Sequence, residues 1–444
     1  MQTWFELNKH KRFCVLGLGL SGMSCVRFLV EQGIEPSVCD TRSLPPGIDE
    51  LKQLLPQVDL TLGQPSVEYL QQFDFVLMSP GIDPRADIYQ TVLANGTELI
   101  NEIELFAHGI ALTDKQVVAV TGSNGKSTVV SLLGEALNKA EITTSVGGNI
   151  GRPALDCLSD SSDIIVLELS SFQLEFCPSF AADIALVLNV SEDHMDRYAD
   201  LAHYAQTKRA IYQNARLAIF NHDDQQTYPE QHPNAISFGV DCQADWQVEQ
   251  GHACLQGNAV CSLQQSRLVG LHNQQNMLAV TAVAYALNAD PRLIEIAFNE
   301  FSGLQHRCEK VSEKLGVTWV NDSKATNVGA TLAALSGLAN IEGQLVLIAG
   351  GVGKDADFSP LQSVLNSNVD HLITLGRDGQ QIAALKANAQ HVSSIQDAVK
   401  LAAKITQVGD TVLLSPACAS LDMFKNFEQR GLAFVAAVEA LNEQ

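Results

Sequence analysis

Residues 119–128, Ala-Val-Thr-Gly-Ser-Asn-Gly-Lys-Ser-Thr, have the types and spacing of a phosphate-binding turn. The run Val117–Val120 is apolar and β-branched, as in a buried parallel strand, and apolar residues recur at helical spacing after the turn. Such a turn directs backbone N–H groups and the helix dipole at an anion. Lys126 would neutralise the anion, and the Ser127 hydroxyl would bind Mg²⁺. The spacing differs from that of the ordinary P-loop, because Val120 stands where that motif has its first glycine. The alternative is an ordinary turn between a strand and a helix that happens to contain Gly-Lys-Ser.

A second glycine-rich turn lies near the N-terminus. Gly17, Gly19 and Gly22 follow an apolar run, and Asp40 ends the next expected strand. In a dinucleotide-binding fold this turn holds a pyrophosphate and the acid binds a ribose hydroxyl, so a nicotinamide-dependent dehydrogenase is one interpretation. The same turn suits any diphosphate, including that of a UDP-sugar. No obvious hydride-transfer site accompanies it, so the dehydrogenase is an alternative only.

Two polar residues that follow expected strands could bind a metal ion. Glu168 ends the buried run 164–168, and His194 follows the run 184–189. The carboxyl ends of parallel strands meet at the edge where α/β sheets bind ligands, and a carboxylate beside a phosphate site is a good Mg²⁺ ligand. The alternatives are a capped strand end for Glu168 and an ordinary loop histidine for His194.

Lys208 lies on the apolar face of an expected helix, because Leu201, Tyr204, Lys208 and Ile211 share one side of it. A buried ammonium is unfavourable unless it is paired or neutralised. One interpretation is a lysine that reaches solvent along its own stem. The other is a lysine converted to an anion by carbamylation, which would join a metal site.

Several loops in the last third of the chain carry positive charge, although the net charge is −22. They contain His306-Arg307, the segment 321–327 with Lys324, the segment 350–354 with Lys354, and the segment 415–430 with Lys425. Ser420 is the expected N-cap of a helix in the last of these. Loops after parallel strands share one edge of the sheet, so these cations favour a common anionic site.

Composition limits the class of protein. The 444 residues exceed one ordinary core, and 46% hydrophobic with 18% charged residues is typical of a globular chain. The 50 acidic and 28 basic residues disfavour binding to nucleic acid or to an anionic membrane. No apolar run is long enough to span a membrane, no signal peptide is apparent, and the ten cysteines form no Cys-x-x-Cys pair. The cytoplasm is the expected compartment.

The alternation of expected strands and helices predicts an α/β protein of three domains, each an open, mostly parallel sheet with flanking helices. The expected domains are residues 1–105, Rossmann-like; 106–303, of P-loop type; and 304–444, Rossmann-like. Each boundary is expected to within about ten residues.

Six segments together resemble the Mur ligase family, in order along essentially the whole chain. They are 121–128, 167–173 (Leu-Glu-Leu-Ser-Ser-Phe-Gln), 191–197 (Ser-Glu-Asp-His-Met-Asp-Arg), 270–276 (Gly-Leu-His-Asn-Gln-Gln-Asn), 321–327 (Asn-Asp-Ser-Lys-Ala-Thr-Asn) and 415–431. The N-terminal glycine turn and the segment Ser-Pro-Ala-Cys-Ala-Ser-Leu-Asp at 415–422 resemble the members that add D-glutamate.

The resemblance implies ATP-dependent amide formation in peptidoglycan precursor synthesis. The γ-phosphate of ATP would pass to the L-alanine carboxylate of UDP-N-acetylmuramoyl-L-alanine, and the amine of D-glutamate would displace phosphate from the acyl phosphate. ATP is thus a co-substrate, two Mg²⁺ ions and a carbamylated lysine are expected, and the enzyme is expected to be a monomer. The alternatives are another Mur-type or folylpolyglutamate-type ligase, the dehydrogenase, or a regulatory nucleotide-binding module.

The resemblance also implies roles for individual residues. The catalytic residues would be Lys126, His194 and Lys208. ATP would contact Gly122, Ser123, Asn124, Gly125, Lys126, Ser127, Thr128, Asn276, Arg307 and Asp322. Metal ligands would be Ser127 and Glu168 for one ion, and His194 with carbamylated Lys208 for the other. The uridine nucleotide would contact Thr41, Arg42 and the turn Ser79 to Ile82, which includes Gly81. D-glutamate would contact Lys324, Thr326, Ser420, Leu421 and Phe427. Further contacts with these two substrates would come from Gly19, Leu20, Ser21, Asp40, Asn149, Gln173 and His306. The loop 350–355 departs from the family pattern, with Val352 where Asp is usual and Asp355 where Gly is usual.

Overall fold

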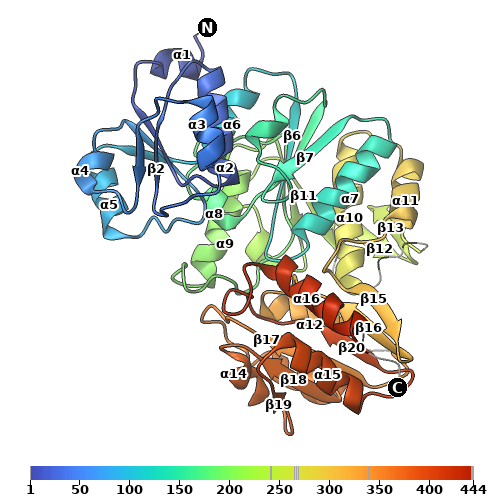
Figure 1. Ribbon diagram of the computed structural model, residues 1–444. Coiled ribbons are helices and arrows are strands. Elements are labelled where there is room, and N and C mark those ends of the chain that lie inside the picture. Colours follow the sequence, from blue (N-terminus) through green and yellow to red (C-terminus); the bar gives the residue numbers. More distant parts are fainter. Residues whose placement is uncertain are drawn as a thin grey trace.

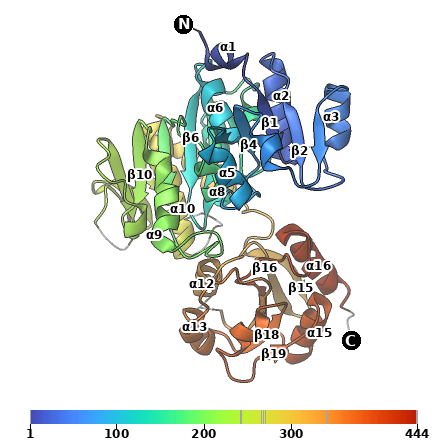
Figure 2. The ribbon, with the colours of Figure 1, turned by 90° about the vertical axis from the view of Figure 1, so that its left-hand side faces the viewer.

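The computed structural model describes residues 2–240, 243–264, 266, 268, 270–338 and 341–441. They form three sheets, and the parts of the chain built on these sheets are here called the first, second and third domains (Figure 1). The three-domain α/β fold predicted from the sequence is confirmed. The first and second domains lie side by side, and the third lies below the second in both views of the ribbon (Figures 1 and 2).

The first sheet has the strand order β3-β2-β1-β4-β5, and all its neighbouring strands are parallel. Its strands are β1 (Phe13–Leu16), β2 (Ser37–Asp40), β3 (Leu60–Leu62), β4 (Phe75–Met78) and β5 (Glu98–Ile100). Its helices are α1 (Trp4–Asn8), α2 (Leu20–Glu31), α3 (Ile48–Leu54), α4 (Val67–Leu70), α5 (Asp87–Ala94) and α6 (Glu102–Ile110). The glycine turn joins β1 to α2, and a Cβ on Gly22 would lie only 1.8 Å from the Gly17 carbonyl oxygen, so only glycine allows this close packing.

The second sheet has the order β14-β13-β12-β11-β10-β9-β6-β8-β7, with an antiparallel edge of β12 to β14. Its strands are β6 (Gln116–Thr121), β7 (Thr144–Gly148), β8 (Ile164–Glu168), β9 (Ile184–Val187), β10 (Leu217–Asn221), β11 (Ala235–Gly239), β12 (Trp246–Glu249), β13 (His252–Leu255) and β14 (Asn258–Ser262). Its α-helices are α7 (Lys126–Lys139), α8 (Ser171–Leu174), α9 (Leu201–Arg209), α10 (Leu271–Ala286) and α11 (Pro291–Glu300), and its 3₁₀ turns are η1 (Leu155–Cys157), η2 (Ala210–Tyr212) and η3 (Gln225–Thr227). β6 lies between β8 and β9 and is parallel to both, so the carboxyl ends of these three strands lie side by side at one edge of the sheet.

The third sheet has the order β15-β16-β20-β17-β18-β19, and only β15 is antiparallel. Its strands are β15 (Glu309–Lys314), β16 (Val317–Asn321), β17 (Leu345–Gly350), β18 (His371–Leu375), β19 (Gln390–His391) and β20 (Thr411–Leu414). Its helices are α12 (Val328–Gly337), α13 (Leu361–Asn368), α14 (Gly379–Ala383), α15 (Ile395–Ile405) and α16 (Phe427–Glu439).

The prediction that Ser420 caps a helix is wrong. Residues from Ser420 form turns, and the last helix, α16, begins at Phe427. Its N-cap is Asn426, whose extended backbone (φ −161°) lets its side chain accept a hydrogen bond from the Gln429 N–H. An asparagine cap of this kind satisfies one of the free N–H groups of the first helical turn, so it sets where the helix begins.

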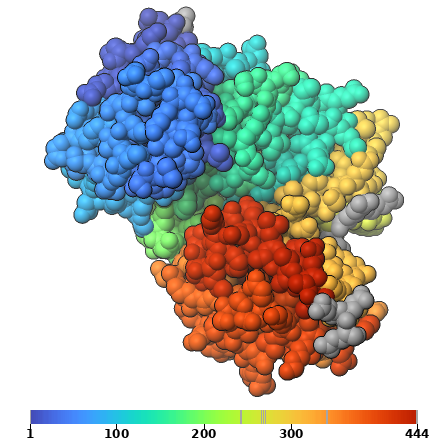
Figure 3. Space-filling model, in the orientation of Figure 1, coloured from blue at the N-terminus to red at the C-terminus, as the bar shows by residue number. Residues whose placement is uncertain are grey.

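The first and second domains share an apolar core cluster, whereas the third domain has clusters of its own. One continuous cluster runs from Phe5 in the first domain to Ala218 in the second. The third domain has two clusters of its own, one on each face of its sheet. In the space-filling view the first two domains are packed broadly together, whereas the third is a distinct body against the second (Figure 3).

Candidate active site

The predicted phosphate-binding turn lies between β6 and α7, as the sequence indicated. Gly125 caps the helix in a left-handed conformation (φ 83°), which glycine adopts without strain. Lys126 Nζ donates to the carbonyl oxygens of Gly122 and Ser123 at 2.6 and 2.9 Å. The ammonium group therefore lies over the turn, at the N-terminus of a 14-residue helix. This arrangement concentrates positive charge where an anion would bind.

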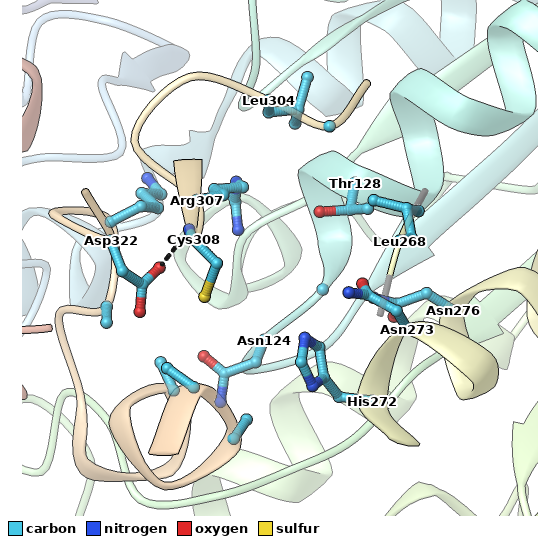
Figure 4. Close-up of a pocket in the computed structure, with 17 residues that line it drawn as sticks. Asn124, Thr128, Leu268, His272, Asn273, Asn276, Leu304, Arg307, Cys308 and Asp322 are labelled. Atoms are coloured by element: carbon cyan, nitrogen blue, oxygen red, sulfur yellow. Dashed lines mark hydrogen bonds between the residues drawn. The ribbon is translucent and has the colours of Figure 1, made fainter. Parts of the chain in front are cut away.

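A pocket opens beside this turn, between the second and third domains (Figure 4). The second domain contributes the start of α7 and the first turns of α10, and the third contributes the beginning of its sheet and one face of α12. Its lining residues are Asn124, Gly125, Thr128, Leu268, His272, Asn273, Asn276, Gly303, Leu304, Arg307, Cys308, Asp322, Lys324, Ala325, Ala330, Ala333 and Ala334. It is here called the nucleotide pocket, because six of the residues predicted to contact ATP line it: Asn124, Gly125, Thr128, Asn276, Arg307 and Asp322.

Asp322 is a buried carboxyl at the rim between β16 and the nucleotide pocket. Its two oxygens accept hydrogen bonds from the Cys308 N–H at 3.2 Å and the Ser415 hydroxyl at 2.8 Å. Burial raises its pKa to about 7, against the effect of these hydrogen bonds and of Arg307. The charge of this group therefore responds to what binds beside it.

A second pocket adjoins the first on the other side of the turn and is here called the catalytic pocket. Its lining residues are Ser123, Asn124, Gly125, Lys126, Asn149, Glu168, Ser170, Ser171, Phe172, Asp193, His194, Tyr204, Lys208, Arg307, Lys324, Thr326 and Asn327. The two pockets share Asn124, Gly125, Arg307 and Lys324. A molecule with a base in the first pocket and phosphates on the turn would thus present its terminal phosphate to the second.

Glu168 and Ser127 offer oxygen ligands for a divalent cation. Glu168 Oε1 accepts from the Asn149 side chain at 3.0 Å, whereas the buried Oε2 has no hydrogen-bond partner. The pKa of Glu168 is lowered, because the neighbouring Lys126 ammonium and the Ser127 hydroxyl outweigh burial. An ionised, unpartnered carboxylate oxygen beside a hydroxyl suits Mg²⁺, which prefers oxygen and takes few protein ligands. Among the described residues no group of three or more His, Cys, Asp or Glu could hold a metal ion.

Lys208 is buried on the inward face of α9, as its position beside Tyr204 predicted. Only 1% of its surface is exposed, its Nζ donates to the Gly122 carbonyl at 3.0 Å, and the ammonium lies 4.5 Å from the centre of the Tyr204 ring. Burial, with the charge of Lys126, lowers its pKa well below the ordinary value. This environment therefore favours the neutral amine over the ammonium at this position.

His194 follows β9 and adopts a left-handed backbone conformation (φ 59°). Its ring meets the ring of Phe172 edge-on at 4.7 Å, and its Nε2 lies 3.8 Å from a carboxylate oxygen of Asp193. Burial lowers its pKa to about 4, so the imidazole stays neutral near pH 7. A neutral imidazole can bind a metal ion.

Asp193 was not identified from the sequence, yet it joins the second and third domains. It forms an ion pair with Lys354, and its Oδ2 accepts from the Asn327 amide at 3.1 Å. Asn327 also donates to Asn124 Oδ1 at 3.2 Å. Beside Lys126 and His194, the carboxylate has its pKa lowered to about 2, mainly by Lys354. The only signal in the sequence was an acid directly before His194.

The residues predicted for the uridine nucleotide lie at the carboxyl edge of the first sheet, after β1, β2 and β4. Asp40 is buried there, and its carboxylate accepts from the Leu18 N–H at 2.6 Å and from the Arg42 guanidinium at 2.7 and 2.8 Å. Asp40 thus orders the turn after β1 and the loop that carries Thr41 and Arg42.

The residues predicted for D-glutamate are only partly gathered in the catalytic pocket. Lys324 and Thr326 line it, and the Lys324 ammonium lies 3.9 Å from the centre of the Phe427 ring. Burial lowers the Lys324 pKa to about 8. Of the two other neighbouring residues, Ser420 is buried, whereas Leu421 is 70% exposed.

His306 and Gln173 line neither of the two pockets. His306 is buried and its Nδ1 contacts the Asn321 amide at 2.9 Å. Gln173 is buried, caps α8 together with Ser170, and its carbonyl accepts from Asn101 at 2.7 Å. Their contacts support the surrounding loops.

Arg430 lies in the segment 415–431, and its sequence position indicates no role. It is buried in α16 and donates to the Ser323 hydroxyl and carbonyl at 3.0 and 2.8 Å, and to the Cys418 carbonyl at 3.0 Å. It therefore fixes the loop of Lys324 against the loop of Ser420.

The chain is similar to known proteins along nearly its whole length. Three family models match the chain: "Mur ligase MurD-like, N-terminal domain" over residues 11–101, "Mur ligase middle domain" over 120–284 and "Mur ligase, glutamate ligase domain" over 306–418. The UDP-N-acetylmuramoylalanine–D-glutamate ligase of Shewanella oneidensis is 48% identical over 96% of this chain and 98% of its own length. The protein of the same name from Escherichia coli K12 is 45% identical over 97% and 98%, respectively.

Solved structures share the fold at lower identity. The UDP-N-acetylmuramate-alanine ligase MurC of Thermotoga maritima is 17% identical, covers 97% of this chain and all of its own, and superposes with a TM-score of 0.63. The MurF ligase of Thermotoga maritima, solved in complex with ADP, is 16% identical over 97% of this chain and 98% of its own, with a TM-score of 0.61. Sequence matches over the full length, together with this three-domain fold, show that the chain belongs to the Mur ligase family.

Proposed function

We propose that this protein joins D-glutamate to the L-alanine carboxylate of UDP-N-acetylmuramoyl-L-alanine, with cleavage of ATP to ADP and phosphate, in peptidoglycan precursor synthesis. One structural observation carries the proposal: the nucleotide pocket continues into the catalytic pocket across the Lys126 turn. The named relatives at 45–48% identity supply the substrate assignment.

The first step is phosphoryl transfer from ATP to the alanine carboxylate. Base and ribose would occupy the nucleotide pocket, with the phosphates on the turn. The Lys126 ammonium, which in this structure donates hydrogen bonds to two carbonyls of its own turn, would contact the transferred phosphoryl group. Arg307 borders both pockets and would offset the charge that develops during transfer.

The residues present fit two Mg²⁺ ions. Ser127 and Glu168 would hold one, and His194 with carbamylated Lys208 would hold the second. Carbamylation joins the neutral Lys208 nitrogen to the carbon of CO₂ and releases one proton, which leaves an anionic carboxylate in place of an amine. When bound, Mg²⁺ neutralises phosphate charge and polarises phosphoryl oxygens.

The second step is amide formation. The neutral amine of D-glutamate attacks the acyl carbon, the carbon–oxygen bond to phosphate breaks, the nitrogen loses one proton, and inorganic phosphate leaves. Lys324 and Thr326 line the catalytic pocket and would hold the amino acid, and Ser420, Leu421 and Phe427 would complete its site. The residues after β1, β2 and β4 would hold the uridine nucleotide.

The dehydrogenase interpretation is less well supported by the structure. The Asp40 carboxylate, which would bind a ribose hydroxyl, already accepts hydrogen bonds from Leu18 and Arg42 on both oxygens.

Within the described residues no helix is long and apolar enough to cross a membrane. We propose that the enzyme acts in the cytoplasm as a monomer.

ADP release with UDP-N-acetylmuramoyl-L-alanine, measured against a panel of D- and L-amino acids, tests the proposal. We expect release with D-glutamate and none with L-glutamate, L-lysine or meso-diaminopimelate. Release with one of these instead of D-glutamate would indicate a different Mur-type ligase. Oxidation of NADH without ADP release would support the dehydrogenase.

A further inference from the structure

Arg197 is a charged residue almost enclosed between the first and second domains, and none of the chemistry above uses it. Its side chain is 10% exposed. The guanidinium Nε and Nη2 donate to the two carboxylate oxygens of Glu175 at 3.2 and 2.5 Å. Glu175 also accepts from the Tyr198 hydroxyl at 2.7 Å. A bidentate pair of this kind fixes the plane of the guanidinium as well as its position.

The fixed guanidinium supports one wall of the catalytic pocket. Its carbon lies 4.1 Å from the centre of the Phe172 ring, and this ring meets the His194 imidazole edge-on at 4.7 Å. The backbone N–H of Arg197 also donates to the His194 carbonyl at 2.9 Å. Arg197 therefore contacts His194 in two ways. Its backbone N–H binds the His194 carbonyl directly, and its guanidinium packs on the Phe172 ring, which in turn contacts the imidazole.

The same side chain reaches the first domain. Its Nη1 donates to the Ile82 carbonyl at 3.3 Å, and Ile82 closes a turn by donating its N–H to Ser79 at 3.0 Å. Arg85, just after this turn, returns two hydrogen bonds, to the carbonyls of Arg197 at 2.7 Å and Asp196 at 3.0 Å. The turn 79–82 is a predicted part of the uridine-nucleotide site.

We propose that Arg197 is a positioning residue that couples the turn 79–82 of the first domain to His194 in the catalytic pocket. This inference rests on the proposed function. Binding of the uridine nucleotide against the turn orders Ile82, and the guanidinium transmits that order to Phe172 and the imidazole. Without Arg197, the turn loses a contact that favours UDP-substrate binding, and the His194 ring loses its support.

Steady-state kinetics of Arg197→Gln and Arg197→Lys test this coupling. We expect KM for UDP-N-acetylmuramoyl-L-alanine to rise and kcat to fall, each by about tenfold, because small misplacements of reacting groups are costly. KM for ATP should stay within about twofold, since the contacts of Arg197 given above are with residues that do not line the nucleotide pocket. The lysine variant should resemble the glutamine variant, because one ammonium cannot contact Glu175, Ile82 and Phe172 together.

Arg27→Gln is the matched control. Arg27, on α2, also bridges the first two domains through Asp156 at 2.9 Å, and it pairs with Glu50 inside the first domain at 2.6 Å. The Arg27→Gln substitution should lower Tm, but it should not raise KM for the UDP-substrate relative to KM for ATP. Wild-type kinetics in either Arg197 variant, or equal rises in both KM values, would overturn the coupling. If the wild type itself releases no ADP with this substrate, the proposed function fails instead.

Discussion

Arg307 of the third domain donates a hydrogen bond of 2.7 Å to the Ser127 hydroxyl of the second domain. The guanidinium and the charge of Glu168 also interact favourably. A cation from one domain thus lies beside the oxygens proposed to bind Mg²⁺ in another. In the proposed mechanism, bound Mg²⁺ and ATP would exchange this hydrogen bond for contacts with phosphate, which would link nucleotide binding to the arrangement of these domains.

Arg307→Met should therefore impair the use of ATP. We expect kcat/KM for ATP to fall by at least about a hundredfold, the usual effect of removing one oriented charge from a phosphoryl-transfer site. Calorimetric affinity for the UDP-substrate should stay near that of the wild type. Arg292→Met is the control, because Arg292 is exposed on α11 and pairs only with Asp290 among the ion pairs described. Equal losses in both variants would contradict the role of Arg307.

Lys208→Ala should lose activity because an anionic metal ligand is missing. If the native side chain is a carbamate, acetate or another short carboxylate should enter the vacated space and restore part of the activity. Amines should restore none. Turnover of the variant at increasing concentrations of acetate and of methylamine measures this, and rescue by amines alone would show that Lys208 acts as an ammonium.

Glu102→Gln should stabilise the protein at alkaline pH. Glu102 is buried at the start of α6, its Oε2 has no hydrogen-bond partner, and burial raises its pKa from 4.5 to about 7. Between these pH values the folded state holds a proton that the unfolded state has released, so this group makes the free energy of unfolding fall as pH rises. Glutamine keeps the Oε1 acceptor for the Leu155 N–H without the charge.

The stability difference between the variant and the wild type should therefore grow with pH, by up to ~3 kcal/mol. Urea unfolding of both proteins at about pH 5 and about pH 8 measures it. A difference that is the same at both pH values would show that Glu102 is ionised, or neutral, throughout.

Lys354→Met should separate the third domain from the second in the absence of nucleotide. The ion pair with Asp193 joins these domains, and none of the apolar core clusters of the described residues spans both of them. Small-angle scattering should show a larger radius of gyration than for the wild type. Lys386→Met, which removes a contact inside the third domain, should not change it. An unchanged radius in Lys354→Met would contradict this role.

The parts of the site that could be predicted from sequence are those set by local pattern. The strand and helix around Lys126 follow from a β-branched run, glycines and helical spacing. The inward position of Lys208 follows from its face of α9, beside Tyr204. These features depend on neighbours within a few turns of the chain.

Contacts between domains could not be predicted in this way. Asp193 meets Asn327 and Lys354, which lie 134 and 161 residues later, and nothing local indicates such a pair. Arg197 meets Ile82, 115 residues earlier. The false helix start at Ser420 has a local cause, because Asn426 offers a competing cap that spacing alone did not separate from Ser420.

Transfer of a labelled oxygen tests the central claim, that the alanine carboxylate is activated by phosphorylation. UDP-N-acetylmuramoyl-L-alanine carrying ¹⁸O in its carboxylate would be incubated with ATP, Mg²⁺ and D-glutamate, and the phosphate analysed by mass spectrometry. We expect one labelled oxygen in each inorganic phosphate formed with the wild type, and no labelled phosphate with Lys126→Ala. Amide product accompanied by unlabelled phosphate would contradict an acyl phosphate intermediate.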